Sequence, residues 1–108
     1  MIKIYGISNC DKIKKIKSWM KNEEIEFSFQ DYKKNPPHKE LLKNWFQQLG
    51  EYPINKRGTT YRKLKNEIEK SDDEELLNII ISNPSLLKRP ITEKNLKILS
   101  IGEINPQF

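Results

Sequence analysis

The apolar residues of the first 31 positions change their spacing twice, and this change restricts the possible folds more than any other feature. Ile2 and Ile4 alternate with polar neighbours up to Gly6, as in a short strand. Between residues 11 and 22 the apolar side chains share one helical face: Ile13, Ile16, Trp19 and Met20. The stretch "EFSFQD" then alternates again. A strand, a helix and a strand in this order predict a βαβ unit with parallel strands.

In the middle of the chain, apolar residues recur at helical intervals in three successive stretches. The first of them ends at Gly50, a residue typical of the position just past a helix. The last has Ser71 three residues before Glu74, the spacing of a capping box. We therefore expect a helical region at about residues 37–83.

The end of the chain returns to short β-like runs. The runs "KRPIT" and "LKILSI" predict an antiparallel hairpin whose connection spans residues 93–95. The full order β-α-β-α-α-α-β-β is that of a thioredoxin-like (glutaredoxin-like) α/β fold, a mixed four-stranded sheet with an inserted helical region. A length of 108 residues predicts a single domain, 1–108.

Composition and charge exclude several classes of protein. No apolar stretch approaches the roughly 18 residues of a membrane span, so we expect a cytoplasmic protein without a membrane partner. The net charge of +5 could suit an anionic partner, but basic residues do not interleave with aromatic ones, so a nucleic acid is not expected. One Cys and one His are too few ligands for a structural zinc site, so no metal is expected.

Cys10 is the only cysteine, and it stands directly between the first strand and the first helix. The backbone N–H groups and the positive end of the helix dipole stabilise a thiolate there. Lys12, Lys14 and Lys15 add positive charge, which Asp11 opposes. A nucleophile is therefore favoured, with a buried inert cysteine as the alternative. Any redox cycle at Cys10 needs a thiol from another molecule.

A second candidate site residue is Arg89, just before Pro90 at the start of a predicted strand. A proline is tolerated there when its missing N–H is not needed. The Arg89 guanidinium suits a carboxylate or an oxyanion, although an arginine without further context is more often a surface residue. The spacing alone does not bring Arg89 to Cys10.

Three stretches in this order, "YGISNCDKIKK", "NKRGTTYRKL" and "PSLLKRPI", closely resemble the arsenate reductase (ArsC)-like family. Its YffB-like branch, small glutathione-dependent thiol reductases, is the nearest. The resemblance covers roughly residues 1–102.

This resemblance implies a thioredoxin-like fold with a helical insertion. It also implies a nucleophilic cysteine at Cys10, a cis-proline at Pro90, and an arginine, Arg89, next to the cysteine. By this resemblance Cys10 and Arg89 correspond to the catalytic residues of the family, and Pro90 corresponds to its strand-starting proline.

Two departures from the family pattern restrict which function of the family this chain is expected to have. Arsenate reductases of the family carry a further arginine on the last strand, where this chain reads "LSIG", so arsenate reduction is not expected. The Spx-type regulators of the family have C-x-x-C, whereas Ile13 stands three residues after Cys10. A disulfide switch within this motif is impossible here.

The prediction is therefore a glutathione-dependent thiol–disulfide oxidoreductase with no bound cofactor. Glutathione or a glutaredoxin would be its reducing co-substrate and partner, and a small anionic or disulfide compound its substrate. We expect the substrate or glutathione to contact Asn9, Lys14, Arg57, Arg62 and Pro90.

Alternatives stay open for some of these residues and for the function. Asn9 could instead cap the first helix, and Arg57 and Arg62 could form structural ion pairs. A non-enzymatic, Spx-like regulatory protein with a protein partner is the alternative function.

Overall fold

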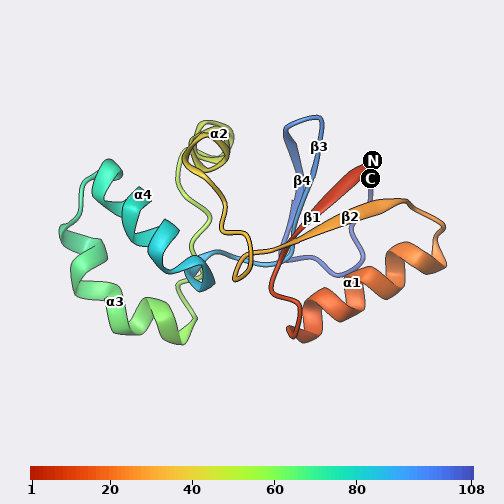
Figure 1. Ribbon diagram of the computed structural model, residues 1–108, viewed down its shortest axis with the longest axis horizontal. Coiled ribbons are helices and arrows are strands. Elements are labelled where there is room, and N and C mark those ends of the chain that lie inside the picture. Colours follow the sequence, from red (N-terminus) through yellow and green to blue (C-terminus); the bar gives the residue numbers. More distant parts are fainter. The chain divides into compact units, whose positions relative to one another are not determined.

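A computed structural model describes residues 1–108, and its elements follow the predicted order (Figure 1). They are β1 (Ile2–Gly6), α1 (Asp11–Asn22), β2 (Phe27–Asp31), α2 (Lys39–Leu49), α3 (Thr59–Lys70), α4 (Asp73–Ser82), the 3-10 helix η1 (Pro84–Leu86), β3 (Ile91–Lys94) and β4 (Lys97–Ile101). The chain divides into two units. The first consists of Met1–Asn35 and Lys88–Phe108, and the second of Pro36–Leu87.

The first unit contains the sheet and α1. Its strands are ordered β2-β1-β3-β4, as Figure 1 shows. β1 pairs with β2 in parallel, whereas β1 with β3 and β3 with β4 are antiparallel. The sheet is therefore mixed and four-stranded, and the βαβ prediction for the first 31 residues is confirmed.

One face of this sheet packs against α1 because the strand and the helix each present a row of apolar side chains. Ile2 and Ile4 of β1 form a buried cluster with three residues of α1: Ile13, Ile16 and Met20. The opposite face of α1 carries the exposed lysines. Lys17 differs, since its ammonium lies 3.8 Å from the centre of the Phe29 ring. The alternation of Ile2 and Ile4 thus decides which face of the sheet the helix covers.

The connection between β3 and β4 is shorter than predicted. β3 continues through Glu93 and Lys94, and the turn consists of Asn95 and Leu96 alone, with φ of 51° and 66°. A two-residue turn with positive φ at both positions matches the twist of a hairpin. Leu96 is an uncommon residue in such a turn, and the sequence pattern therefore placed the connection two residues too early.

The second unit contains the three predicted helices. α2 ends where predicted, because Gly50 takes the left-handed conformation with φ of 77°. Trp45 of α2 and Leu77 and Ile80 of α4 are buried. No helix of the chain is long and apolar enough to cross a membrane.

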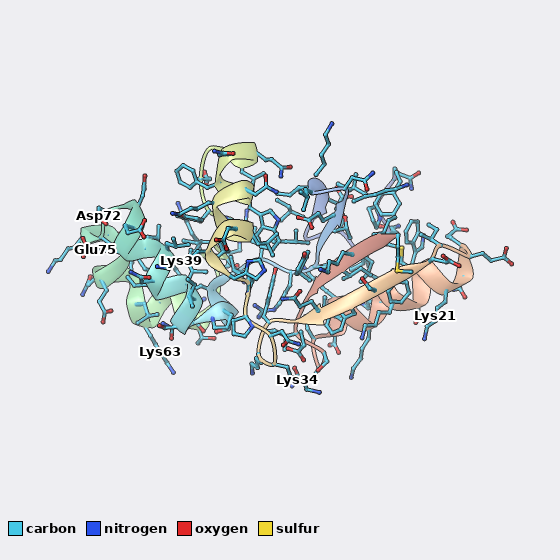
Figure 2. All side chains as sticks on the ribbon, turned by 45° about the horizontal axis from the view of Figure 1, so that its top comes forward. Lys21, Lys34, Lys39, Lys63, Asp72 and Glu75 are labelled. Carbon is cyan, nitrogen blue, oxygen red and sulfur yellow. The ribbon has the colours of Figure 1, made fainter.

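The capping box of α4 lies one residue later than predicted. The side chain of Asp72 accepts a hydrogen bond from the Glu75 amide (2.8 Å), and Glu75 accepts one from the Asp72 amide (3.4 Å). Figure 2 labels both side chains, which lie next to each other. Ser71 instead donates to the Ile68 carbonyl (2.7 Å) at the end of α3. Ser71 with Glu74 and Asp72 with Glu75 have the same spacing, and the hydrogen bond of Ser71 to α3 leaves the capping box to Asp72.

The loop between β1 and α1 is held by the last residue of β2. Asp31 pairs with Gly6, and its carboxylate accepts hydrogen bonds from the Ser8 hydroxyl (2.8 Å) and the Ser8 amide (3.3 Å). Its other oxygen accepts one from the Lys33 amide (2.9 Å). Burial raises the pKa of Asp31, but these hydrogen bonds and the charge of Lys34 outweigh it, so that its pKa lies below the ordinary 3.8. Lys34 is labelled in Figure 2.

We predict that Asp31→Asn lowers stability at neutral pH and that its effect fades in acid. A carboxyl whose pKa is lower in the folded than in the unfolded chain stabilises the fold above the unfolded pKa, and this contribution is lost as the pH falls through the folded value. The free energy of unfolding in urea, measured from pH 7 to pH 2.5, checks this. A difference between wild type and variant that stays constant over this range would contradict it.

Gly6, at the end of β1, is packed too closely for a side chain. A Cβ at this position would overlap the end of the Ile13 side chain and lie 2.8 Å from its Cγ1 atom and 3.5 Å from the Cβ of Arg89. Ile13 is fully buried and cannot move aside without disturbing the core. Gly6 therefore allows α1 and the Arg89 segment to meet beside β1.

We predict that Gly6→Ala destabilises the protein by about 1–3 kcal/mol, the usual cost of overpacking a core. Urea unfolding measures this difference. Gly58→Ala is a matched control, because a Cβ there would lie 3.3 Å from the flexible side-chain amide of Asn55. Equal losses for the two variants would contradict the close packing at Gly6.

Candidate functional site

Cys10 is the N-cap residue of α1. Its backbone is extended (φ −82°, ψ 133°), and its carbonyl accepts hydrogen bonds from the amides of Ile13 and Lys14 (both 3.1 Å). Its side chain makes no capping hydrogen bond. The backbone thus starts the helix while the sulfur atom is left for other chemistry.

Cys10 is packed on part of its surface against apolar side chains. The residue is partly buried, carries a free thiol, and packs against the cluster formed by β1 and α1. Its amide donates to the Ile7 carbonyl (3.0 Å), which closes the turn that leads into the helix. The backbone of Cys10 is therefore held on both sides, at the positive end of a twelve-residue helix.

The Arg89–Pro90 peptide bond is cis, as the resemblance implies. Pro90 is buried, and its carbonyl accepts a hydrogen bond from the Gly102 amide (2.7 Å). Arg89 is half-buried, and its Cβ lies beside Gly6, where the chain leaves β1 toward Cys10. The structure thus brings the Arg89–Pro90 segment to the start of the cysteine loop, a contact that sequence spacing could not establish.

Two of the other predicted site residues also lie in the first unit. Asn9 is exposed in the turn before Cys10. It does not cap α1, because Cys10 occupies the cap position, and the alternative role for Asn9 was wrong. Lys14 is exposed in the second turn of α1, and its amide bonds to the Cys10 carbonyl.

Arg57 and Arg62 lie in the second unit, around the start of α3. The Arg62 guanidinium donates to the Arg57 carbonyl (3.5 Å), and the Arg57 amide donates to the Asn55 side chain (3.2 Å). Both side chains are exposed and neither forms an ion pair, so the structural alternative for these two arginines was wrong. Their contact with a substrate stays a prediction.

Sequence reasoning missed the two residues that hold the site together, Asp31 and Tyr32. Asp31 binds the cysteine loop through Ser8, and the Tyr32 hydroxyl donates to the Lys88 carbonyl (3.3 Å). A usable signal was present, because the carboxyl ends of two parallel strands lie at the same edge of a sheet. The residues after "FSFQ" could therefore have been expected beside the loop after β1.

The excess positive charge of the chain belongs to the unit that contains Cys10. This unit has twelve lysines and arginines against seven acids, whereas the second unit has eight of each. The exposed lysines of α1 form no ion pairs. A positive field around the thiol favours the approach of anionic molecules.

Comparisons with known proteins agree on one family. A model of the ArsC family matches residues 5–107. The global transcriptional regulator Spx of Streptococcus mutans is 30% identical over 105 residues, which cover 94% of this chain and 76% of that protein.

Two solved structures extend the likeness to three dimensions. A YffB protein superimposes with a TM-score of 0.84 at 29% identity, covering 97% of this chain and 94% of that one. An arsenate reductase-related protein from Brucella melitensis gives a TM-score of 0.76 at 34% identity, covering 94% and 86%. The predicted thioredoxin-like fold is confirmed. With a family match over nearly its whole length and this shared thiol-redox fold, the chain belongs to the ArsC family.

Proposed function

We propose that the protein is a thiol–disulfide oxidoreductase in which Cys10 is the nucleophile. The observation that carries this proposal is the position of its only cysteine: the backbone of Cys10 caps α1, while its sulfur takes no part in capping. Helix N-termini and nearby lysines stabilise the thiolate, which is the form that attacks disulfides. The Arg89 segment beside the start of the same loop supports the assignment.

In the first step the Cys10 thiolate attacks one sulfur of a substrate disulfide. A new S–S bond forms between Cys10 and that sulfur, and the old S–S bond breaks. The other half of the substrate leaves as a thiolate and takes a proton from water. Half of the substrate is now reduced, and Cys10 is held in a mixed disulfide.

In the second step a thiol from another molecule must attack this mixed disulfide, because the chain has no second cysteine. Glutathione or a glutaredoxin is the proposed co-substrate. The external thiol gives up its proton to water and attacks the substrate sulfur; a new S–S bond joins it to this half of the substrate, the bond to Cys10 breaks, and Cys10 is released as a thiolate. No bound cofactor takes part in the cycle, and glutathione points to the cytoplasm, where thiols are kept reduced.

Arg89 is proposed to hold a carboxylate of glutathione or of an anionic substrate near the thiol. A guanidinium binds carboxylates through two parallel hydrogen bonds. The further contacts are assigned to Asn9, Lys14, Arg57, Arg62 and Pro90. The excess charge of the first unit supports an anionic substrate.

We predict that oxidised glutathione forms one mixed disulfide with the intact protein, at Cys10. Mass spectrometry after incubation checks this: one glutathionyl adduct in the wild type, removed again by reduced glutathione or a glutaredoxin. Cys10→Ser is the matched control, since it replaces only the sulfur atom and should carry no adduct. A folded wild-type protein that forms no adduct would contradict the proposal.

A regulatory protein is the second candidate, because the Spx regulator matches most of this chain. In this reading the same fold contacts a protein partner, such as RNA polymerase, and Cys10 is dispensable. The absence of C-x-x-C excludes a disulfide switch within the motif. Arsenate reduction is the weaker enzymatic reading, because β4 carries no arginine.

The two functions predict opposite behaviour of Cys10→Ser in a strain that lacks the native gene. The oxidoreductase function predicts that the variant fails to complement, because no other thiol in the chain can replace Cys10. Growth under oxidative stress measures complementation, and capture of RNA polymerase with each protein serves as a parallel assay. Full complementation together with polymerase capture by both proteins would favour the regulatory function.

A further inference from the structure

The segment that carries Arg89 is anchored on both sides. The Lys88 carbonyl accepts a hydrogen bond from the Tyr32 hydroxyl (3.3 Å), and the Pro90 carbonyl accepts one from the Gly102 amide (2.7 Å). Arg89 therefore lies between two fixed peptide groups. Of the two anchors, the Gly102 bond extends the pairing of β3 with β4, whereas the Tyr32 bond comes from a side chain.

Tyr32 also binds the strand that leads to Cys10. Its amide donates to the Gly6 carbonyl (2.7 Å), and Gly6 is the residue beside which the Arg89 Cβ lies. Gly6, Tyr32 and Arg89 thus meet at one point, where β1 ends. A shift of the Lys88–Pro90 segment would therefore change the contacts at the start of the cysteine loop.

The environment of Tyr32 allows its hydroxyl to act only as a fixed donor. The side chain is 0% exposed, and its ring stacks on that of Tyr5, with 6.4 Å between ring centres. Burial raises the pKa of Tyr32 well above the ordinary 10.0, against the opposing charge of nearby Arg89, so the hydroxyl keeps its proton. Buried hydroxyls are costly without a partner, and the Lys88 carbonyl is the partner here.

We propose that Tyr32 is a positioning residue: its hydrogen bond to the Lys88 carbonyl fixes the Lys88–Pro90 segment so that the charge of Arg89 acts on anionic groups approaching Cys10. Tyr32 touches neither the thiol nor the substrate in this role. The inference rests on the proposed function only in taking Cys10 as the reacting group. In this inference the preference for anionic substrates depends on the buried Tyr32 hydroxyl as well as on Arg89 itself.

The test compares two alkylating reagents of similar size, anionic iodoacetate and neutral iodoacetamide. The ratio of their second-order rate constants at Cys10 reports the local positive charge, because the thiolate fraction cancels in the ratio. We expect Arg89→Ala to lower this ratio. Tyr32→Phe, which removes one hydroxyl and leaves the ring, should also lower it, by no more than Arg89→Ala does, because it acts through the same charge.

Two further variants make the assignment specific. Tyr5→Phe removes a hydroxyl from the stacked neighbour, which donates to Glu93 (3.1 Å) instead, and should leave the ratio unchanged. The double variant of Tyr32→Phe and Arg89→Ala should have the ratio of Arg89→Ala alone, because both changes act through one charge. A Tyr32→Phe ratio equal to that of the wild type would overturn the inference, and so would an unchanged ratio in Arg89→Ala.

The test is independent of the proposed function, because any accessible thiol reacts with these reagents whether or not the protein reduces disulfides. Urea unfolding of Tyr32→Phe verifies that the variant is folded. If it is not, NMR of the wild type decides: a slowly exchanging Tyr32 hydroxyl proton close to the protons of Lys88 and Arg89 supports the inference, and a rapidly exchanging one overturns it.

Discussion

The hydrogen bonds made at the end of β2 are the interactions on which the candidate site depends. Asp31 and Tyr32 are neighbours in the chain, yet their side chains bind different segments: Asp31 binds the loop before Cys10, and Tyr32 binds the segment before Pro90. Neither segment belongs to a helix or a strand. The last residue of β2 and the residue after it can serve both because the parallel pairing of β1 and β2 brings the ends of these strands to the same edge.

Close packing at Gly6 explains why these segments can meet. A helix, the end of a strand and the Arg89 segment share a space too small for one methyl group. The cysteine loop therefore starts from a point that is fixed by steric contact, and Asp31 fixes its next residues by hydrogen bonds. The backbone that leads to Cys10 is therefore fixed on the side of β1 and of β2.

Charge and fold act together in the first unit. The lysines lie on the face of α1 opposite to its apolar residues because the same periodicity that buries Ile13 and Ile16 exposes them. The helix that covers the sheet thus also carries five of the twelve basic residues of this unit. The second unit has no net charge, so the net positive charge of the chain lies in the unit with the thiol.

Most of the fold could be predicted from local pattern. The bounds of α1 and the end of α2 at Gly50 follow from periodicity and from a residue that tolerates positive φ. The errors arose where two local signals competed, as with Ser71 and Asp72, or where tertiary pairing imposed a turn on an unfavourable residue, as with Leu96. In the site, Cys10 could be identified from its place before a helix, but its relation to Arg89 required a resemblance to a family.

The sequence by itself determined the order of the elements, the single thiol and hence the need for an external one, because these depend on residue types and short-range spacing. Only the tertiary structure decided which residues hold the site. The place of Asp31 and Tyr32 after a predicted parallel strand puts them near the loop after β1, but the sequence does not identify their partners Ser8 and Lys88, which lie 23 and 56 residues away. Such bonds join segments that are far apart in the chain, and no local propensity reports them.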